Sequence, residues 1–150
     1  MSTNLSIYAI PVAWLLCLVP HVYAVAHHDA KSPQKKVNLT QPRSFVASLE
    51  QNQALDKATK DTIIRAESAQ QNGFENIGIF AAAVVVGNVA GLEPRFLNGF
   101  AGAYVLSRMV YIWVYINNTT AAMTRVRTTV YFSGVFCCTV LFLAAGNKMR

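Results

Sequence analysis

Charged side chains are scarce in this chain of 150 residues. Only 13% of the residues are Asp, Glu, Lys or Arg, whereas 53% are hydrophobic. Soluble domains carry about a quarter charged residues, so this composition leaves too little polar surface for a water-facing globule. The net charge of +6 does not indicate nucleic-acid binding, because the basic residues form no dense patch interleaved with aromatic residues. We therefore expect a membrane protein with basic loops and no nucleic-acid partner.

Cysteine is rare as well, and ligands for a metal are few. The three cysteines all lie in apolar runs: Cys17, Cys137 and Cys138. An odd number without regular spacing excludes a disulfide framework and a zinc site, and it predicts small, buried apolar side chains. His27, His28 and Asp29 follow the first apolar run, but adjacent histidines without further ligands do not make a metal site. We therefore expect no metal.

Four long apolar segments predict an all-α integral membrane protein. They cover residues 5–26, 62–92, 96–116 and 125–145. Each is close to the roughly 20 residues that a bilayer crossing requires, and no strand-like alternation competes with a helical pattern. We expect residues 1–150 to form one membrane domain, a bundle of four transmembrane helices.

The first segment has an alternative interpretation as a cleaved signal peptide. Val22, Tyr23 and Ala24 would form a passable cleavage site. Residues 1–6 contain no lysine or arginine, however, and the apolar run is long for a signal. We expect the segment to be retained as a membrane span, and removal of residues 1–24 is the alternative.

The loops between the spans differ in charge. Lysine and arginine concentrate between the first and second spans and again between the third and fourth, whereas the opposite side has only Arg95, Lys148 and Arg150. Cytoplasmic loops favour lysine and arginine. Both termini should therefore lie in the lumen, which we take to be that of the endoplasmic reticulum, and residues 30–60 should form a cytosolic loop.

That long loop has the composition of a linker. Pro33 and Pro42 interrupt helices, and Gln, Asn, Ser and Lys dominate residues 31–60. We therefore expect a mobile segment. Asn38 and Asn118 each begin a match to the glycosylation acceptor pattern. Because both lie on the side expected to be cytosolic, both should stay unmodified.

The second span begins with a polar helix face. Residues three and four apart share a face, and this groups Arg65, Ser68, Asn72, Glu75 and Asn76. A carboxylate at the mouth of a membrane helix is costly unless it is paired or faces a wet cavity. The third span contains one arginine, Arg108, and only a short turn separates the two spans. We expect Glu75 and Arg108 to form an ion pair, which could also be purely structural.

Tyrosines and arginines continue this polar surface on the next two spans. Arginines clamp carboxylates with paired hydrogen bonds, and a glutamate can hold an ammonium group. The combination predicts a site for a polar, anionic, peptide-like ligand, with an apolar groove nearby for a lipophilic second substrate. The contributing residues are Arg108, Tyr111 and Tyr115 on the third span, and Arg125, Arg127, Thr128 and Tyr131 at the start of the fourth.

Two motifs resemble those of the MAPEG family, the membrane-associated proteins of eicosanoid and glutathione metabolism. The first is Arg65-x6-Asn72-x2-Glu75-Asn76 followed by Ile77-x2-Phe80, and the second is Arg108-x2-Tyr111-x3-Tyr115. The two together are fairly specific, and the resemblance covers about residues 58–145. It implies a homotrimer of four-helix bundles, with glutathione bound between neighbouring subunits near the cytosolic face.

The resemblance also implies roles for individual residues. An arginine at the start of the fourth helix activates the thiol in the catalytic members, and either Arg125 or Arg127 could fill that role. Arg127 is favoured because Tyr131 follows it one turn later. A guanidinium beside a thiol favours the thiolate, which is the nucleophile. The residues expected to bind glutathione are Arg65, Asn72, Glu75, Arg108, Tyr111, Tyr115 and Tyr131.

One position departs from the family pattern. Glutathione-using members commonly have an arginine one turn before the motif asparagine, where this chain has Ser68. The favoured hypothesis is a microsomal-type glutathione transferase, in which the thiolate attacks a lipophilic electrophile that enters from the bilayer. Two alternatives keep the fold: an isomerase or cyclase of a lipophilic metabolite that does not use glutathione, and a non-catalytic lipid-binding or scaffold protein.

Overall fold

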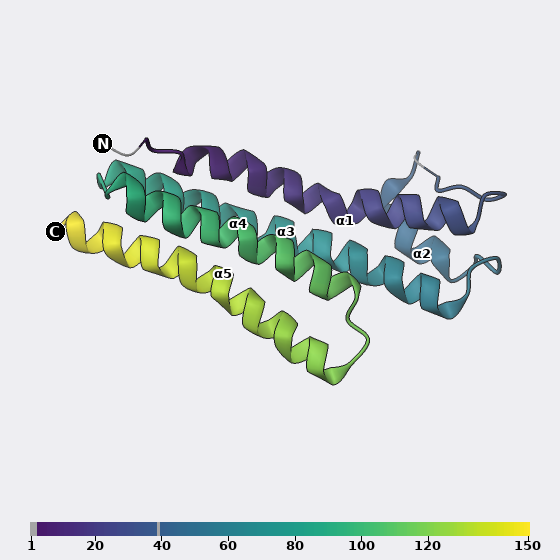
Figure 1. Cartoon of the computed structure of the whole chain (residues 1–150). Helices are drawn as coiled ribbons and strands as arrows, with labels where there is room; N and C mark the ends of the chain where they lie inside the picture. The colour runs from purple at the N-terminus through teal and green to yellow at the C-terminus, as the bar shows by residue number, and fades with distance from the viewer. Residues whose placement is uncertain (1–2, 39) are drawn as a thin grey trace.

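The computed structural model describes residues 3–38 and 40–150, and within them it contains helices and no strands (Figure 1). Four long helices are each long and apolar enough to cross a membrane: α1 (Ala9–Lys31), α3 (Lys57–Val89), α4 (Pro94–Ile116) and α5 (Ala121–Lys148). The shorter elements are η1 (Ser6–Tyr8), η2 (Pro42–Ser44) and α2 (Phe45–Leu49). The predicted all-α architecture with four membrane spans is confirmed.

Side-chain caps fix where two of the long helices begin. The Asp56 carboxylate accepts a hydrogen bond from the Thr59 amide at 2.8 Å, which satisfies one of the free N–H groups of the first turn. Hydrogen bonding from Thr59 also lowers the pKa of Asp56 below its usual value. Thr120 caps α5 in the same way, through the Met123 amide at 3.2 Å. The helices thus begin at Lys57 and Ala121, before residues 62 and 125, where the two apolar segments were expected to begin.

A tight turn joins α3 to α4. Gly91 has a φ of +66°, a conformation that glycine adopts without the strain imposed by a Cβ atom. Pro94 then occupies the first turn of α4, where its missing N–H group is not needed. The Lys148 ammonium donates a hydrogen bond to the Gly91 carbonyl. This contact fastens the end of α5 to the α3–α4 turn.

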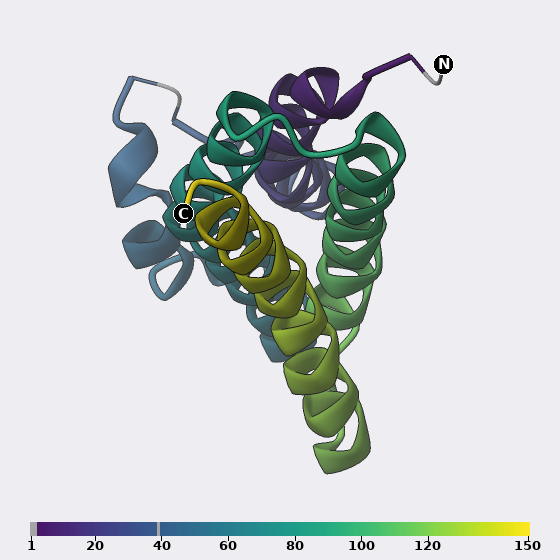
Figure 2. The same cartoon turned by 90° about the vertical axis from the view of Figure 1, so that its left-hand side faces the viewer.

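The four long helices do not stay together along their whole length. Helices α1, α3 and α4 run side by side, and both termini lie at the same end of the bundle (Figure 1). At that end α5 joins the bundle, and the shared apolar core includes Phe80 and Tyr104, whose rings stack with centroids 3.9 Å apart. Toward its N-terminal end α5 diverges from the other helices (Figure 2). This divergence leaves room for a cavity beside the first turns of α5.

The segment predicted as a linker contains a packed helix. Phe45 and Leu49 of α2 are buried with Leu55 and Ile63 in a second apolar cluster at the far end of the bundle. The predicted loop over residues 30–60 thus contains a short packed helix that its composition did not predict. A helix as short as α2 has too few turns to produce an apolar periodicity, so the prolines and polar residues around it concealed it.

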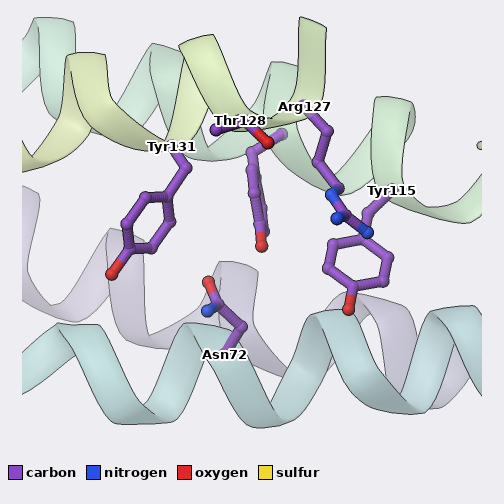
Figure 3. Close-up of a pocket in the computed structure, with 6 residues that line it drawn as sticks. Asn72, Tyr115, Arg127, Thr128 and Tyr131 are labelled. Atoms are coloured by element: carbon purple, nitrogen blue, oxygen red, sulfur yellow. The ribbon is translucent and has the colours of Figure 1, made fainter. Parts of the chain in front are cut away.

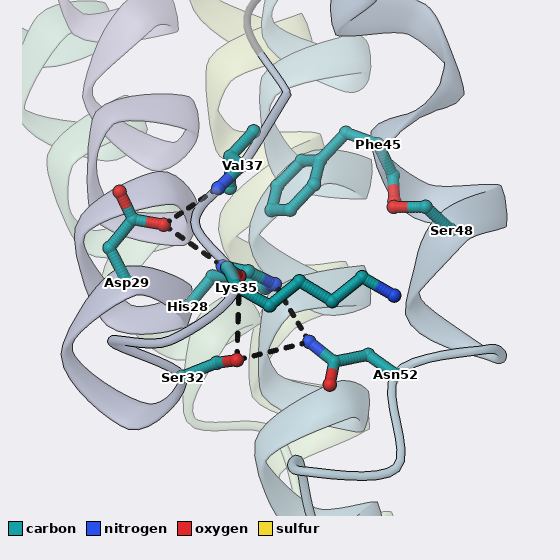
Figure 4. Close-up of polar contacts among 8 residues, drawn as sticks. All are labelled: His28, Asp29, Ser32, Lys35, Val37, Phe45, Ser48 and Asn52. Carbon is teal, nitrogen blue, oxygen red and sulfur yellow. Dashed lines mark hydrogen bonds and ion pairs between the residues drawn. The ribbon is translucent and has the colours of Figure 1, made fainter.

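We call α2 and the residues around it, 42–55, the α2 cap. A network of polar groups holds the α2 cap on the end of α1 (Figure 4). His28 is buried, with Nδ1 3.0 Å from Asp29 Oδ1 and Nε2 3.2 Å from Asn52 Nδ2. The Val37 amide donates to the same Asp29 oxygen at 2.9 Å, and the Ala54 amide donates to Asn52 Oδ1 at 3.1 Å. Both ring nitrogens of His28 thus have protein partners, and its role is to join α1 to the cap.

Candidate functional site

A polar cavity of about 290 Å³ lies where α5 diverges from the bundle (Figure 3). Its walls come from the middle of α3, the last turns of α4 and the first turns of α5. In Figure 3 the Asn72 side chain points from α3 toward the side chains on α5. The lining residues are Asn72, Tyr111, Tyr115, Arg127, Thr128 and Tyr131. The structure therefore brings most of the predicted site residues to one place.

Arg127 supplies the positive charge of this cavity. Its guanidinium carbon lies 4.7 Å from the centre of the Tyr115 ring, an arrangement in which the ring's electron-rich face attracts the cation. Among residues 3–38 and 40–150, no carboxylate lies within ion-pair distance of Arg127. Arg125 is exposed and does not line the cavity. Of the two candidate arginines, Arg127 is the one placed to act on a ligand there.

The tyrosines form a connected aromatic wall. The Tyr111 ring lies 5.4 Å from that of Tyr115 and 6.1 Å from that of Tyr131, measured between centroids. The Tyr131 hydroxyl donates a hydrogen bond to Asn76 Oδ1 at 3.3 Å, so α5 is linked to α3 at the edge of the cavity. These contacts hold the wall in place without using the polar groups of Asn72 and Arg127.

Asn72 presents an acceptor that finds no partner among the described residues. Its Oδ1 atom is buried and has no hydrogen-bond partner within the described part of the chain. Its backbone carbonyl is occupied, since Asn76 Nδ2 donates to it at 2.8 Å. A buried carbonyl oxygen without a donor costs roughly 1–3 kcal/mol. A ligand N–H group placed in the cavity would remove that penalty.

The predicted ion pair between Glu75 and Arg108 is wrong within one chain. Glu75 is exposed and accepts a hydrogen bond from Gln71 Nε2 at 3.0 Å, whereas Arg108 is only 5% exposed. Residues three and four apart form a polar stripe on α3, and this stripe is too wide for all its side chains to point in one direction. Asn72, on one edge of the stripe, faces α5. Glu75, on the other edge, faces away from the chain.

Arg65 and Ser68 also lie on the polar face of α3 but do not line the cavity. Arg65 Nε donates to the Ile116 carbonyl at 2.9 Å, and Nη2 donates to Thr62 Oγ1 at 2.9 Å. The guanidinium therefore satisfies a free carbonyl at the C-terminal end of α4. Ser68 Oγ donates to the Ile64 carbonyl at 2.8 Å within the same helix. Neither side chain offers its polar group to the cavity.

A further ionisable pair was missed by the sequence analysis. His21 Nδ1 lies 2.7 Å from Glu67 Oε1, which joins α1 to α3 within their membrane-spanning parts. An ionisable side chain in a membrane helix usually faces the bundle interior and pairs with another. Applied to His21 and Glu67, that rule could have identified the contact from the sequence.

The comparisons with known proteins give one positive result. No curated protein and no solved structure matches this chain. The model of the MAPEG family matches residues 7–147, a range that includes the whole of α1, α3 and α4 and nearly all of α5. The family resemblance inferred from the two motifs is thereby confirmed, and the chain belongs to the MAPEG family.

Proposed function

We propose that this MAPEG protein is a glutathione-dependent transferase of the endoplasmic reticulum membrane, and that the polar cavity is part of its glutathione site. The observation that carries the proposal is the position of Arg127, whose cation lies in the cavity wall without a carboxylate partner among the described residues. The volume of about 290 Å³ is near the lower end for ligand pockets, roughly 300–1,000 Å³. A neighbouring subunit of a homotrimer would complete the site.

The lining groups suit a tripeptide that carries both charges and a thiol. Asn72 Oδ1 has no donor within the part of the chain that the structure describes, and it would accept an N–H from an amide or an ammonium group. The Tyr115 and Tyr131 side chains border the same space and can donate or accept through their hydroxyls. The carboxylate of Glu75 is exposed and does not line the polar cavity of its own subunit. In a trimer it would serve the ammonium group of a glutathione shared with the next subunit.

Arg127 would favour the ionised form of the bound thiol. A free thiol has a pKa of about 8.5, and a neighbouring guanidinium lowers it. Each pKa unit is worth about 1.4 kcal/mol and changes the ratio of thiolate to thiol tenfold. The thiol proton passes to water, and the sulfur lone pair then forms the new C–S bond. With an aryl chloride as the acceptor, the C–Cl bond breaks and chloride leaves with its electron pair.

Conjugation of glutathione to a reactive aryl chloride by the detergent-purified protein tests the proposal. We expect the Arg127→Ala variant to lose kcat by about tenfold or more, since one pKa unit is tenfold in thiolate, while the Kd for glutathione changes less. The Arg125→Ala variant is the matched comparison, because it removes an exposed cation from the same helix. Failure of the wild-type protein to bind glutathione would refute the proposal.

One observation favours a second candidate, an isomerase or cyclase of a lipophilic metabolite. Ser68 stands where glutathione-using relatives have an arginine, and its hydroxyl is occupied within its own helix. A cationic clamp for a glutathione carboxylate is therefore missing from this part of α3. Conversion of a lipophilic substrate at an unchanged rate after removal of glutathione would support this candidate over the transferase.

A further inference from the structure

Four cations follow the first membrane span with no acidic residue among them. Residues 30–49, which we call the basic stretch, contain no Asp or Glu. Their cations are Lys31, Lys35, Lys36 and Arg43, all of them exposed. With the flanking acids Asp29 and Glu50 included, the net charge over residues 29–50 is still +2. An excess of this kind is enough to orient a membrane protein, but orientation does not depend on where each cation lies.

None of these cations forms an ion pair within residues 3–38 and 40–150. Other cations at the same end of the bundle are used inside the chain. Lys60 Nζ donates to the Glu50 carbonyl at 3.4 Å. Arg65 Nε donates to the Ile116 carbonyl at 2.9 Å. The positive charge of the basic stretch is therefore available to a partner outside the chain.

The backbone that carries two of these cations is held in place by hydrogen bonds (Figure 4). The Lys35 amide donates to the Ser32 carbonyl at 3.1 Å, and Ser32 Oγ donates to the Lys35 carbonyl at 3.4 Å. The Val37 amide donates to Asp29 Oδ1 at 2.9 Å. Lys35 and Lys36 thus extend from an ordered turn at the end of α1. A surface that is already ordered loses less conformational entropy when a partner binds.

The α2 cap lies beside the last turns of α1 and not beyond them. The Phe45 ring lies 6.5 Å from the His21 ring and 5.5 Å from the His28 ring, measured between centroids. His21 is ten residues before the end of α1 at Lys31, which is about 15 Å along the helix. Phe45 also shares an apolar cluster with Ala24, a residue of the apolar run that predicts the first span. The α2 cap is therefore at the depth where a membrane span ends, and in Figure 2 the blue segment that contains α2 stands to one side of the long helices.

The helix α2 presents an apolar surface outward as well as inward. Phe45 and Leu49 are buried against the bundle, whereas Val46 is 39% exposed and Ala47 is exposed. Arg43 precedes Val46 by three residues, so the two side chains share the outer face. A helix that combines apolar and basic side chains on one exposed face suits the boundary of a membrane. There the apolar groups reach the acyl chains and the cations stay with the phosphates.

We propose that the basic stretch and the outer face of α2 bind anionic phospholipid head groups of the leaflet that adjoins this end of the bundle. The phosphate oxygens would accept hydrogen bonds from Lys35, Lys36 and Arg43. The side chains of Val46 and Ala47 would contact the first carbons of the acyl chains. Each lysine or arginine near an anionic membrane surface strengthens binding by about fivefold. Phosphatidylcholine offers the same phosphate, but its quaternary ammonium group cancels the negative charge, so the surface should select lipids with a net negative charge.

A bilayer lipid fits this surface better than a dissolved anion. A dissolved phosphate would use the cations but would leave the exposed side chain of Val46 in water, where apolar area is unfavourable. The depth of the α2 cap also places the cations beside the head groups. The surface shares no residue with the lining of the polar cavity, so the proposal does not depend on the transferase activity.

Fluorescence quenching in nanodiscs tests the proposal on the full-length protein. The three native cysteines are buried, so a bimane label should attach only to the cysteine introduced by Ala47→Cys. The nanodiscs contain phosphatidylcholine and an increasing fraction of a quencher, which is phosphatidylserine or phosphatidylcholine with the same nitroxide near the head group. We expect half-maximal quenching at a mole fraction about tenfold lower for phosphatidylserine, since each nearby cation contributes about fivefold. Equal quenching by the two lipids, or none by either, would overturn the proposal.

Variants at exposed positions identify the groups responsible. Lys35→Gln combined with Lys36→Gln should reduce the preference for phosphatidylserine by about fivefold or more, because two cations are lost. Glu50→Gln removes an exposed acid beside this surface and should increase the preference. Arg125→Gln removes an exposed cation from α5 and should leave the preference unchanged. A preference that the lysine substitutions do not alter would contradict lipid binding by the basic stretch. So would one that inorganic phosphate abolishes more effectively than sodium chloride at equal ionic strength.

Discussion

The guanidinium carbon of Arg127 lies 4.7 Å from the centre of the Tyr115 ring, so the proposed catalytic arginine rests on a tyrosine from the neighbouring helix. This contact lies where α5 diverges from the bundle (Figure 2). A cation above an aromatic face gains about 0.5–2 kcal/mol. We infer that Tyr115 positions Arg127 and that its ring matters more than its hydroxyl.

Replacement of Tyr115 separates these two parts of the side chain. Tyr115→Phe keeps the aromatic face, and we expect thiolate formation on bound glutathione to stay within about threefold of wild type. Tyr115→Leu removes the face, and the loss of 0.5–2 kcal/mol should lower the thiolate fraction by about 2- to 30-fold. Ultraviolet absorbance of the thiolate at equilibrium provides the measurement. Equal losses in the two variants would show that the hydroxyl, and not the ring, is the active part.

The fold could be predicted largely from hydropathy. Four apolar runs and a shortage of charge are sufficient for four membrane helices, since each run approaches the length of a bilayer crossing. The polar ends of the helices could not be placed in this way, because α3 begins at its Asp56 cap, well before its apolar part. The helix α2 stayed hidden because burial of Phe45 and Leu49 depends on contacts with distant parts of the chain.

The site was less predictable than the fold. Motif and helix face together identified Asn72, Tyr111, Tyr115, Arg127 and Tyr131, which do line one cavity. The sequence could not show that Arg108 faces a different, apolar cavity, or that Glu75 lies on the outer surface of the chain. A helical stripe gives the neighbours of a residue along its own helix. It does not give the rotation of that helix against the others.

Replacement of Arg65 distinguishes a structural role of this side chain from a role in ligand binding. Its Nε donates to the Ile116 carbonyl at 2.9 Å, so Arg65→Met should lower the free energy of unfolding by about 1.5–3 kcal/mol, the usual contribution of a charged hydrogen bond. Thermal unfolding followed by circular dichroism in detergent gives the measurement. We expect glutathione affinity to change less than threefold. Arg125→Met is the control for loss of an exposed cation. A large drop in affinity with normal stability would instead place Arg65 in the ligand site.

Gly134 allows the close approach on which the position of Arg108 depends. The added methyl group of Gly134→Ala would meet the Arg108 guanidinium and Ser107 Oγ, and overpacking of this kind costs about 1–3 kcal/mol. Gly146 lies on the same helix with no heavy atom within 4 Å of an added Cβ. Gly146→Ala should therefore be neutral, or stabilising by about 0.5–1 kcal/mol, because alanine favours a helix over glycine. Similar melting temperatures for the two variants would contradict the close contact.

Asn52 holds the α2 cap by donating through Nδ2 to His28 Nε2 at 3.2 Å and to Ser32 Oγ at 3.3 Å. Asn52→Ala leaves these buried groups without a donor, at a cost of about 1–3 kcal/mol. Hydrogen exchange of the α2 amides should then accelerate by about 5- to 150-fold, the factor that corresponds to this free energy. Gln53→Ala, at the exposed neighbouring position, should leave exchange unchanged. Acceleration in both variants would mean that the cap opens independently of this network.

The predicted orientation in the membrane rests on the distribution of charge, and it can be tested at two exposed positions. The three native cysteines are buried, so a membrane-impermeant maleimide should report only on an introduced cysteine. Lys35 lies in the segment between α1 and α3, Arg150 lies at the opposite end of the chain's bundle, and both are exposed. The excess of lysine and arginine between the spans predicts that the Lys35 side is cytosolic. In sealed microsomes Lys35→Cys should react at once, whereas Arg150→Cys should react only after the membrane is opened by detergent. The reverse pattern would invert the topology and would put the mouth of the polar cavity on the lumenal side.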